Sequence, residues 1–259
     1  MFDLVALETE LAGTDFAGNL HFLPFTDSTN TDAMAAARSA APHGSVYFAD
    51  EQLAGRGRGG HAWHSAAGQG LYVSVLLRPS LPPARLPLLP LIAGLAAADA
   101  IRAATGTSID LRWPNDLLIG DRKAGGILAE AGAEPGLGAF AIIGIGINVH
   151  QREFAADLAT PATSLDLEAG RRVSRQQLLV TLLKSLEREA LGLADAGAAE
   201  SIPRRVERAS TWVRGRRIEV HGSQACTGTA AGLDAHGFLR VQTADGLVTV
   251  QTGGIRAAK

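Results

Sequence analysis

A loop rich in glycine and arginine is the part of this chain best suited to hold an anion. Residues 55–60 read Gly-Arg-Gly-Arg-Gly-Gly and follow an apolar, strand-like run at residues 45–49. Glycine lets the backbone adopt positive φ and turn successive N–H groups toward one point, and arginine adds a charged planar fork that matches carboxylate or phosphate. Arg-Gly runs also occur in flexible or RNA-associated linkers. The loop therefore predicts an anion-binding site only if its neighbours agree.

Short motifs with chemically useful side chains surround this loop. They are Ser28-Thr29-Asn30, Gln52 and Trp63 on either side of the loop, Arg112-Trp113-Pro114-Asn115-Asp116, Lys123-Ala124-Gly125-Gly126-Ile127-Leu128, and Gly144-Ile145-Gly146-Ile147-Asn148. Together with the loop, this ordered set resembles the catalytic core of biotin protein ligases over roughly residues 20–150. One such motif could arise by chance, whereas the ordered set is typical of that family.

The resemblance implies an enzyme that takes ATP and biotin as substrates, with Mg²⁺; no residue is assigned as a direct metal ligand, although Asn148 is an expected contact to ATP or Mg²⁺. In this family the biotin carboxylate attacks the α-phosphorus of ATP and gives biotinyl-5′-AMP and pyrophosphate. A lysine of a biotin carboxyl carrier domain, from acetyl-CoA carboxylase or a related carboxylase, then attacks the acyl carbon. Because both nucleophiles belong to substrates, the site has to supply alignment, charge neutralisation and exclusion of water.

The resemblance also implies roles for particular residues. The residues expected to be catalytic are Lys123, Arg58 and Asp116. Lys123 would hold the biotin carboxylate beside the α-phosphate, Arg58 would retain the adenylate, and Asp116 would orient or deprotonate the acceptor lysine or assist Mg²⁺. The expected biotin contacts are Ser28, Thr29, Asn30, Gln52, Gly55, Arg56, Gly57, Arg58, Lys123, Gly125 and Gly126. The expected contacts to ATP or the adenylate are Arg56, Arg58, Trp63, Asn115, Lys123 and Asn148.

Plainer structural roles compete with several of these assignments. Lys123 ends a polar turn, where a solvated lysine is the default. Residues 28–30 are typical helix-capping types, although one side chain can cap while another faces a ligand. Trp63 could anchor the core as readily as pack on adenine.

The chain also departs from the family pattern at three places. Arg112 stands where lysine is usual, so the positive charge is kept but a compact ammonium is replaced by a planar guanidinium. Ala62 stands where some relatives carry a basic residue. The tail at residues 253–256 matches only loosely, so no C-terminal residue is assigned to the site.

The sequence predicts clustered strands with helices before and after them, and these elements would position the site residues. Such an order indicates an α+β fold, with flanking helices on a mixed or antiparallel sheet. Ser174 opens a capping-box pattern, and the leucines at 178, 179, 182, 183 and 186 lie on one helical face, which predicts a buried helix. Other helices are expected at residues 32–38 and 88–104. The expected strands are residues 20–25, 45–50, 71–77, 109–113, 117–119, 126–131 and 139–149.

The C-terminal part differs in composition. Short β-type runs separated by glycines occupy residues 213–255, which is typical of a small barrel. Biotin protein ligases end in an SH3-like β-barrel of this kind. We therefore expect a catalytic domain at residues 1–210 and an SH3-like barrel at residues 211–259.

Bulk properties limit the possible partners. The net charge of −2 is unlike that of a nucleic-acid-binding domain, and about 20 residues before the first strand are too few for a winged helix-turn-helix, so we expect no DNA binding. The single cysteine, Cys226, favours a reducing cytoplasm. The longest apolar run, residues 86–98, is too short to cross a bilayer, so we expect no membrane. A homodimer is possible.

Other functions stay open. A lipoate ligase or octanoyltransferase shares the expected fold, but the loop and the Lys123 motif favour biotin. A biotin-binding module without turnover is disfavoured by Lys123 and Arg58. A DNA-binding biotin sensor is disfavoured by the short N-terminal segment.

Overall fold

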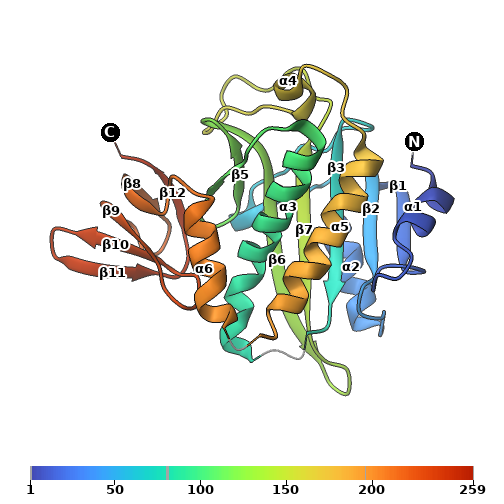
Figure 1. Ribbon diagram of the computed structural model, residues 1–259, viewed down its shortest axis with the longest axis horizontal. Coiled ribbons are helices and arrows are strands. Elements are labelled where there is room, and N and C mark those ends of the chain that lie inside the picture. The colour runs from blue at the N-terminus through green and yellow to red at the C-terminus, as the bar shows by residue number, and fades with distance from the viewer. Residues whose placement is uncertain (1, 80–81, 196, 259) are drawn as a thin grey trace.

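The computed structural model describes residues 2–79, 82–195 and 197–258, which build a large mixed sheet and a smaller C-terminal sheet. Figure 1 shows the large sheet running through the middle of the molecule, with helices α3, α5 and α6 across one face and the C-terminal strands beside it. These helices are α3 (Leu89–Thr105), α5 (Arg175–Gly192) and α6 (Ala198–Arg208). The expected α+β architecture is confirmed.

The large sheet has seven strands in the order β1-β2-β3-β7-β6-β5-β4. Strands β1 and β2 are parallel, because helix α2 (Thr29–Arg38) connects them across the sheet, and all other pairs are antiparallel. The strands are β1 (Leu20–Thr26), β2 (Val46–Gln52), β3 (Gly70–Leu77), β4 (Asp110–Arg112), β5 (Asp116–Ile119), β6 (Arg122–Glu134) and β7 (Gly138–Asn148). Each predicted strand of this sheet is present within a few residues of its expected bounds.

The helices form where the sequence offers caps and apolar stripes. Helix α5 begins after Ser174, whose hydroxyl accepts a hydrogen bond from the Gln177 amide, and its five predicted core leucines are fully buried. Helix α3 ends at Thr105 and is followed by Gly106, which adopts the left-handed conformation that glycine favours at this position. Helix α2 begins at Thr29 rather than Asp32, so residues 29 and 30 belong to its first turn.

Two apolar clusters fill the faces of the large sheet. The main one packs α3 and α5 on one face, and a smaller one packs α2 on the other, around Ala33, Phe140 and Ile142. The helical stretch Ala84–Thr105 is long and apolar enough to cross a membrane by length and composition, but most of it is buried. It packs against α5 and the sheet as a core helix does. Shorter helical elements are α1 (Leu4–Glu10), α4 (Leu165–Ala169), η1 (Arg58–Gly60) and η2 (Pro83–Leu88).

The C-terminal sheet has five antiparallel strands in the order β11-β10-β9-β8-β12. They are β8 (Arg214–His221), β9 (Cys226–Leu233), β10 (Leu239–Thr243), β11 (Gly246–Val250) and β12 (Gly254–Ala257). Trp113 joins this sheet to the large one, because its indole N–H donates to the Gly237 carbonyl at 3.0 Å. The domain boundary at residues 210 and 211 stays a prediction, as does closure into an SH3-like barrel.

Candidate active site

One large cavity opens where β2, β3, β6 and β7 meet the glycine- and arginine-rich loop and the C-terminal tail. Its volume is about 1520 Å³, ample for a nucleotide together with a second small molecule. All predicted site residues line it except Gly55 and Gly125. These two glycines lie behind the wall. A Cβ at Gly55 would come within 2.4 Å of the Trp63 carbonyl oxygen, and one at Gly125 within 2.8 Å of the Gly146 carbonyl oxygen.

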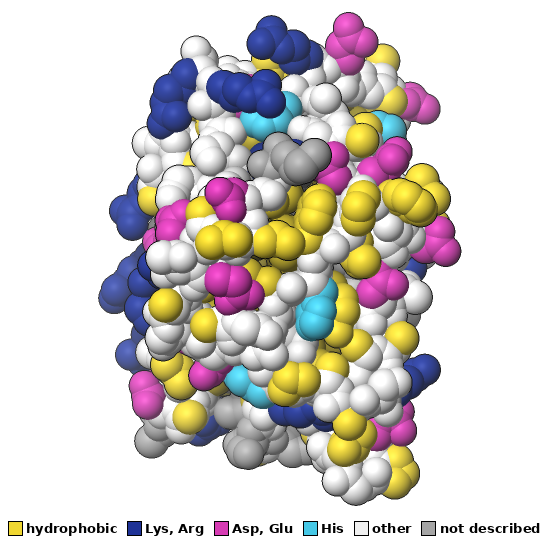
Figure 2. Space-filling view, turned by 90° about the vertical axis from the view of Figure 1, so that its right-hand side faces the viewer, with side chains coloured by type: hydrophobic (Ala, Val, Ile, Leu, Met, Phe, Trp, Pro, Cys, Tyr) yellow, Lys and Arg dark blue, Asp and Glu magenta, His cyan; other side chains and the backbone are white. Residues whose placement is uncertain are grey.

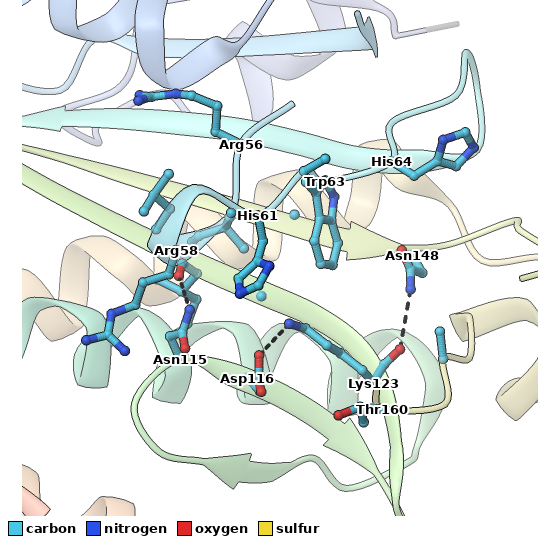
Figure 3. Close-up of a pocket in the computed structure, with 18 of the residues that line it drawn as sticks. Arg56, Arg58, His61, Trp63, His64, Asn115, Asp116, Lys123, Asn148 and Thr160 are labelled. Atoms are coloured by element: carbon cyan, nitrogen blue, oxygen red, sulfur yellow. Dashed lines mark hydrogen bonds and ion pairs between the residues drawn. The ribbon is translucent and has the colours of Figure 1, made fainter. Parts of the chain in front are cut away.

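An ion-pair cluster lies on one side of the cavity, at the start of β5 and β6. The Lys123 ammonium is 2.5 Å from one carboxylate oxygen of Asp116. The Arg112 guanidinium donates to the other oxygen through Nε at 3.0 Å and Nη2 at 2.6 Å. Figure 3 shows the Lys123 side chain extending across the cavity toward Asp116. Arg112, at the position where biotin protein ligases usually have lysine, thus holds Asp116 through two hydrogen bonds from one planar guanidinium.

These two cations decide the charge state of Asp116. Burial alone would raise the pKa of its carboxyl group, but Lys123 and Arg112 hold that pKa below its ordinary value. Asp116 is therefore a carboxylate at neutral pH and a weak base. Its geometry suits it to orienting Lys123 better than to removing a proton from an acceptor amine.

Replacing Asp116 by Asn should destabilise the protein by about 1–3 kcal/mol, because two buried or half-buried cations lose their partner. A carboxyl group whose folded-state pKa is depressed stabilises the fold above its unfolded-state pKa and loses that contribution as pH falls through the folded-state pKa. The difference in free energy of unfolding between wild type and D116N, measured in urea, should therefore be largest at pH 7. It should shrink as the pH falls below the ordinary pKa of a carboxyl group. Asp121→Asn, at a side chain 86% exposed, is the control. An equal loss in D121N, or a pH-independent gap, would contradict this assignment.

A row of polar side chains occupies the cavity wall formed by the start of α2 and the end of β2. Gln52 accepts a hydrogen bond from the backbone N–H of Thr29 at 3.0 Å, and the same Gln52 oxygen is 3.2 Å from the Thr29 hydroxyl. Its amide donates to the Ser65 hydroxyl at 2.7 Å. Ser28 occupies the cap position of α2 without making a side-chain cap bond, so its buried hydroxyl is available to a ligand.

The glycine- and arginine-rich loop folds back on itself and brings Trp63 over the sheet. The Gly57 amide donates to the His61 carbonyl at 2.7 Å, and Arg56 pairs with Ala62. Gly59 and Gly60 make the turn at φ 68° and 79°. Trp63 rests on Gly146 and Gly126, and the Lys123 ammonium is 5.4 Å from its ring centroid. Trp63 therefore belongs to the cavity wall and lies outside the apolar core clusters.

The two loop arginines point to different anchors. Arg56 pairs with Glu130 of β6 at 2.6 Å. Arg58 donates to the Gly253 carbonyl and, at 2.8 Å, to the Thr252 hydroxyl. Figure 3 shows Arg58 extending away from Lys123. No C-terminal residue was assigned to the site from the sequence, but in the structure residues 252–256 of the tail line one side of the cavity.

Asn115 and Asn148 are both tied into the framework. The Asn115 side chain donates to the Ile127 carbonyl at 2.7 Å, which fixes the turn after Pro114 on β6. Asn148, at the end of β7, donates to the Thr163 carbonyl at 3.0 Å and weakly to that of Lys123 at 3.4 Å. Asn148 therefore positions the backbone of Lys123, whatever else it contacts.

Several cavity residues were missed from the sequence. One group of them follows β7, in a segment without regular structure that carried no recognisable motif. Thr160 is one of them, and its hydroxyl accepts a hydrogen bond from Arg112 at 2.9 Å. The others from this segment are His150, Gln151, Arg152, Glu153, Phe154, Ala155, Leu158, Ala159 and Ala162.

Comparison with known proteins shows which family the chain resembles. Residues 22–148 match the model of the biotin/lipoate A/B protein ligase family, and residues 214–255 match that of the biotin protein ligase C-terminal domain. The bifunctional ligase/repressor BirA of Bacillus spizizenii is 34% identical over 257 residues, which are 96% of this chain and 76% of that protein. The chain belongs to the biotin/lipoate A/B protein ligase family.

Other relatives within the family agree. The biotin–[acetyl-CoA-carboxylase] ligase of Mycobacterium tuberculosis is 34% identical over 236 residues, covering 89% of this chain and 85% of that one. The biotin protein ligase of Aquifex aeolicus, solved in complex with biotin and ATP, superimposes with a TM-score of 0.78 at 30% identity. That match covers 93% of this chain and all of the Aquifex chain. The similarity to these two ligases thus extends over both the large sheet and the C-terminal sheet of this chain.

Proposed function

We propose that this chain is an ATP-dependent biotin–protein ligase. It joins biotin to ATP, forming biotinyl-5′-AMP and releasing pyrophosphate. It then transfers biotin to a lysine of a biotin carboxyl carrier domain and releases AMP. The observation that carries the proposal is the meeting of three features at one cavity: the Lys123 ammonium, the glycine- and arginine-rich loop, and the polar row at Ser28. These features supply a cation, an enclosing loop and hydrogen-bonding groups for a ureido ring.

Lys123 is the group best placed to work on the reacting atoms. Asp116 holds its side chain, and Asn148 and Thr163 hold its backbone. A fixed ammonium lowers the repulsion between the biotin carboxylate and the α-phosphate, and stabilises charge that develops during transfer. In the second step the acceptor amine is itself the nucleophile, so Lys123 can keep its proton throughout.

We infer that Mg²⁺ enters with ATP. Within residues 2–79, 82–195 and 197–258, no group of three or more His, Cys, Asp and Glu side chains could hold a metal ion. These residues do not fit a resident metal, whereas the phosphate oxygens of ATP are ligands that Mg²⁺ prefers.

Trp63 is proposed to pack on the adenine, and Gly146 makes room for it. A Cβ at Gly146 would lie 2.6 Å from the Trp63 indole nitrogen, so Gly146→Ala should displace the ring. We expect the KM for ATP to rise on the order of tenfold, because an aromatic stack on a base contributes about 1–3 kcal/mol. Gly192→Ala, where nothing lies within 4 Å of an added Cβ, should leave the KM unchanged. An unchanged KM in G146A would remove this role from Trp63.

The transfer step can be tested with a purified biotin carboxyl carrier domain of an acetyl-CoA carboxylase. With ATP, Mg²⁺ and biotin, the carrier should gain one biotin at its acceptor lysine, detected by avidin binding and by mass. A lipoyl domain offered lipoate or octanoate is the parallel acceptor. Modification of the lipoyl domain alone would contradict the proposal and favour lipoate or octanoate transfer.

A homodimer and a cytoplasmic location also stay proposals. Strand β1 is the outer strand of the large sheet, and β1 and α1 carry the exposed apolar side chains Phe25 and Val5. Figure 2 shows hydrophobic side chains gathered across this face of the molecule. Such a face is typical of a contact with another protein surface.

A further inference from the structure

Glu130 of β6 connects the start of α2 with the glycine- and arginine-rich loop, two parts of the cavity to which the proposed function gives separate roles. Its carboxylate oxygen Oε2 accepts a hydrogen bond from the Asn30 side-chain amide at 2.8 Å. The same oxygen accepts one from Arg56 of the glycine- and arginine-rich loop at 2.6 Å. Nothing in the sequence pointed to Glu130, because a glutamate on a strand is usually a solvated residue. In the structure it is the junction between the start of α2 and the loop.

The polar row continues from Asn30 without a break. The Asn30 carbonyl oxygen accepts a hydrogen bond from the Ser74 hydroxyl at 2.6 Å, and Ser74 is 2.8 Å from the Thr29 hydroxyl. Because Ser74 gives its hydroxyl hydrogen to Asn30, the Thr29 hydroxyl is the donor to Ser74. Thr29 reaches Gln52 through its backbone N–H, which donates to the Gln52 side-chain oxygen at 3.0 Å. A chain of hydrogen bonds therefore leads from Gln52, at the base of the loop, through the buried start of α2 to Glu130 and back to Arg56.

This arrangement leaves Asn30 little capacity for a ligand. Both amide hydrogens have acceptors, Glu130 at 2.8 Å and the Leu128 carbonyl at 3.3 Å, and its oxygen is occupied by Ser74. A Cβ at Gly144 would lie 2.0 Å from that oxygen, so the Asn30 amide occupies the space that the missing side chain of Gly144 leaves. Asn30 thus supports the polar row, whereas Ser28 presents a hydroxyl to the cavity.

We propose that Glu130 is a positioning residue that fastens Arg56, and with it the glycine- and arginine-rich loop, to the polar row that receives biotin. The inference rests on the proposed function, since it names what couples biotin binding to closure of the loop. A glycine-rich loop loses much conformational entropy when it closes. The Arg56–Glu130 pair offsets part of that cost, and it does so only while Asn30 holds the carboxylate in place. A ligand that rigidifies the polar row therefore also strengthens the hold on the loop.

The test uses trypsin, because Arg56 and Arg58 make the loop itself a cleavage site. Glu130→Gln keeps an acceptor for Asn30 and removes the charge that holds Arg56. We expect the empty protein to be cut in the loop about three to five times faster than wild type, the range for a partly exposed ion pair. Biotin should slow cleavage of wild type and protect E130Q less.

Glu134→Gln is the matched control, since Glu134 lies on the same strand and pairs with Arg38 at 3.5 Å, outside the cavity. It should be cut, and protected by biotin, as wild type is. Arg56→Gln leaves a single loop cleavage site, after Arg58, so cutting after Arg58 is the quantity compared in all variants. R56Q should match E130Q, and the double variant should be no faster than either, because both substitutions remove one interaction. A purely structural role for Glu130 would give additive effects and a lower unfolding midpoint.

The outcomes separate the two proposals. Cleavage of E130Q at the rate of E134Q, or additive effects in the double variant, would overturn the role of Glu130. If E130Q does not fold, the rate for R56Q against wild type decides the same question. Absence of any biotin protection in wild type would instead count against the proposed function.

Discussion

Lys123→Ala should lower biotin-dependent ATP–pyrophosphate exchange by about a hundredfold or more, the loss typical when one preorganised electrostatic group is removed from a reacting centre. The Lys123 ammonium is the cation held at the cavity by Asp116, at 2.5 Å, and it lies against the face of Trp63. Without it, the repulsion between the two anions that must react, carboxylate and phosphate, is not compensated by a cation. The measurement is the initial rate of exchange at saturating ATP and biotin.

Lys184→Ala is the control for this variant, because Lys184 is an exposed lysine on the outer face of α5. It should retain the wild-type rate. Unfolding in urea would show whether K123A remains folded, since Asp116 keeps Arg112 as a partner. Near-normal exchange in folded K123A would show that Lys123 is a structural partner of Asp116 and would remove it from the chemistry.

Arg58→Gly should convert a selective enzyme into one that leaks its intermediate. Arg58 ties the loop to Thr252 and Gly253 of the C-terminal tail, 194 and 195 residues away in the chain. Burial lowers the pKa of Arg58, and the nearby negative charge of Asp116 opposes that shift, which places Arg58 within the electrostatic field of the site. A guanidinium remains charged at neutral pH. Hydrogen bonds from a charged group contribute about 1.5–3 kcal/mol each, so losing them should raise release of biotinyl-5′-AMP at least about tenfold.

Released biotinyl-5′-AMP acylates exposed lysines without regard to their sequence. R58G should therefore label bulk protein such as serum albumin, whereas wild type should label the carrier domain alone. Thr252→Ala, which removes one of the two anchors, should leak less than R58G. Arg171→Gly alters an exposed arginine outside the cavity and should behave as wild type. Labelling by R58G that stays restricted to the carrier domain would contradict the loop's role in retention.

Local patterns in the sequence were enough to predict most elements of the fold. The Ser174 cap and the leucine stripe after it give α5, because capping and helical spacing are properties of neighbouring residues. Helices α1, α4 and α6 and strand β12 were not predicted. Helix α6 contains Pro203, a residue that usually ends a helix. Strand β12 has only four residues, and its extended conformation depends on pairing with β8.

The site was predictable where a motif is compact and unpredictable where distant segments meet. Ser28, Gln52 and Lys123 come together because β2, β6 and the start of α2 belong to one layer of the fold, in which only β3 and β7 lie between β2 and β6. The contact between Arg58 and Thr252 depends on how the C-terminal sheet packs against the large one, which periodicity does not encode. Glu130 was missed for a related reason, since its two partners lie 100 and 74 residues away.

Exchange of labelled pyrophosphate into ATP is the most direct test of the central claim, that this cavity activates biotin. The purified protein would be assayed with biotin, lipoate and octanoate in parallel, with Mg²⁺ and without a carrier protein. We expect exchange that depends on biotin and is near background with the other two acids. Exchange with lipoate alone, or with none of the three acids, would contradict the account and assign the cavity another ligand.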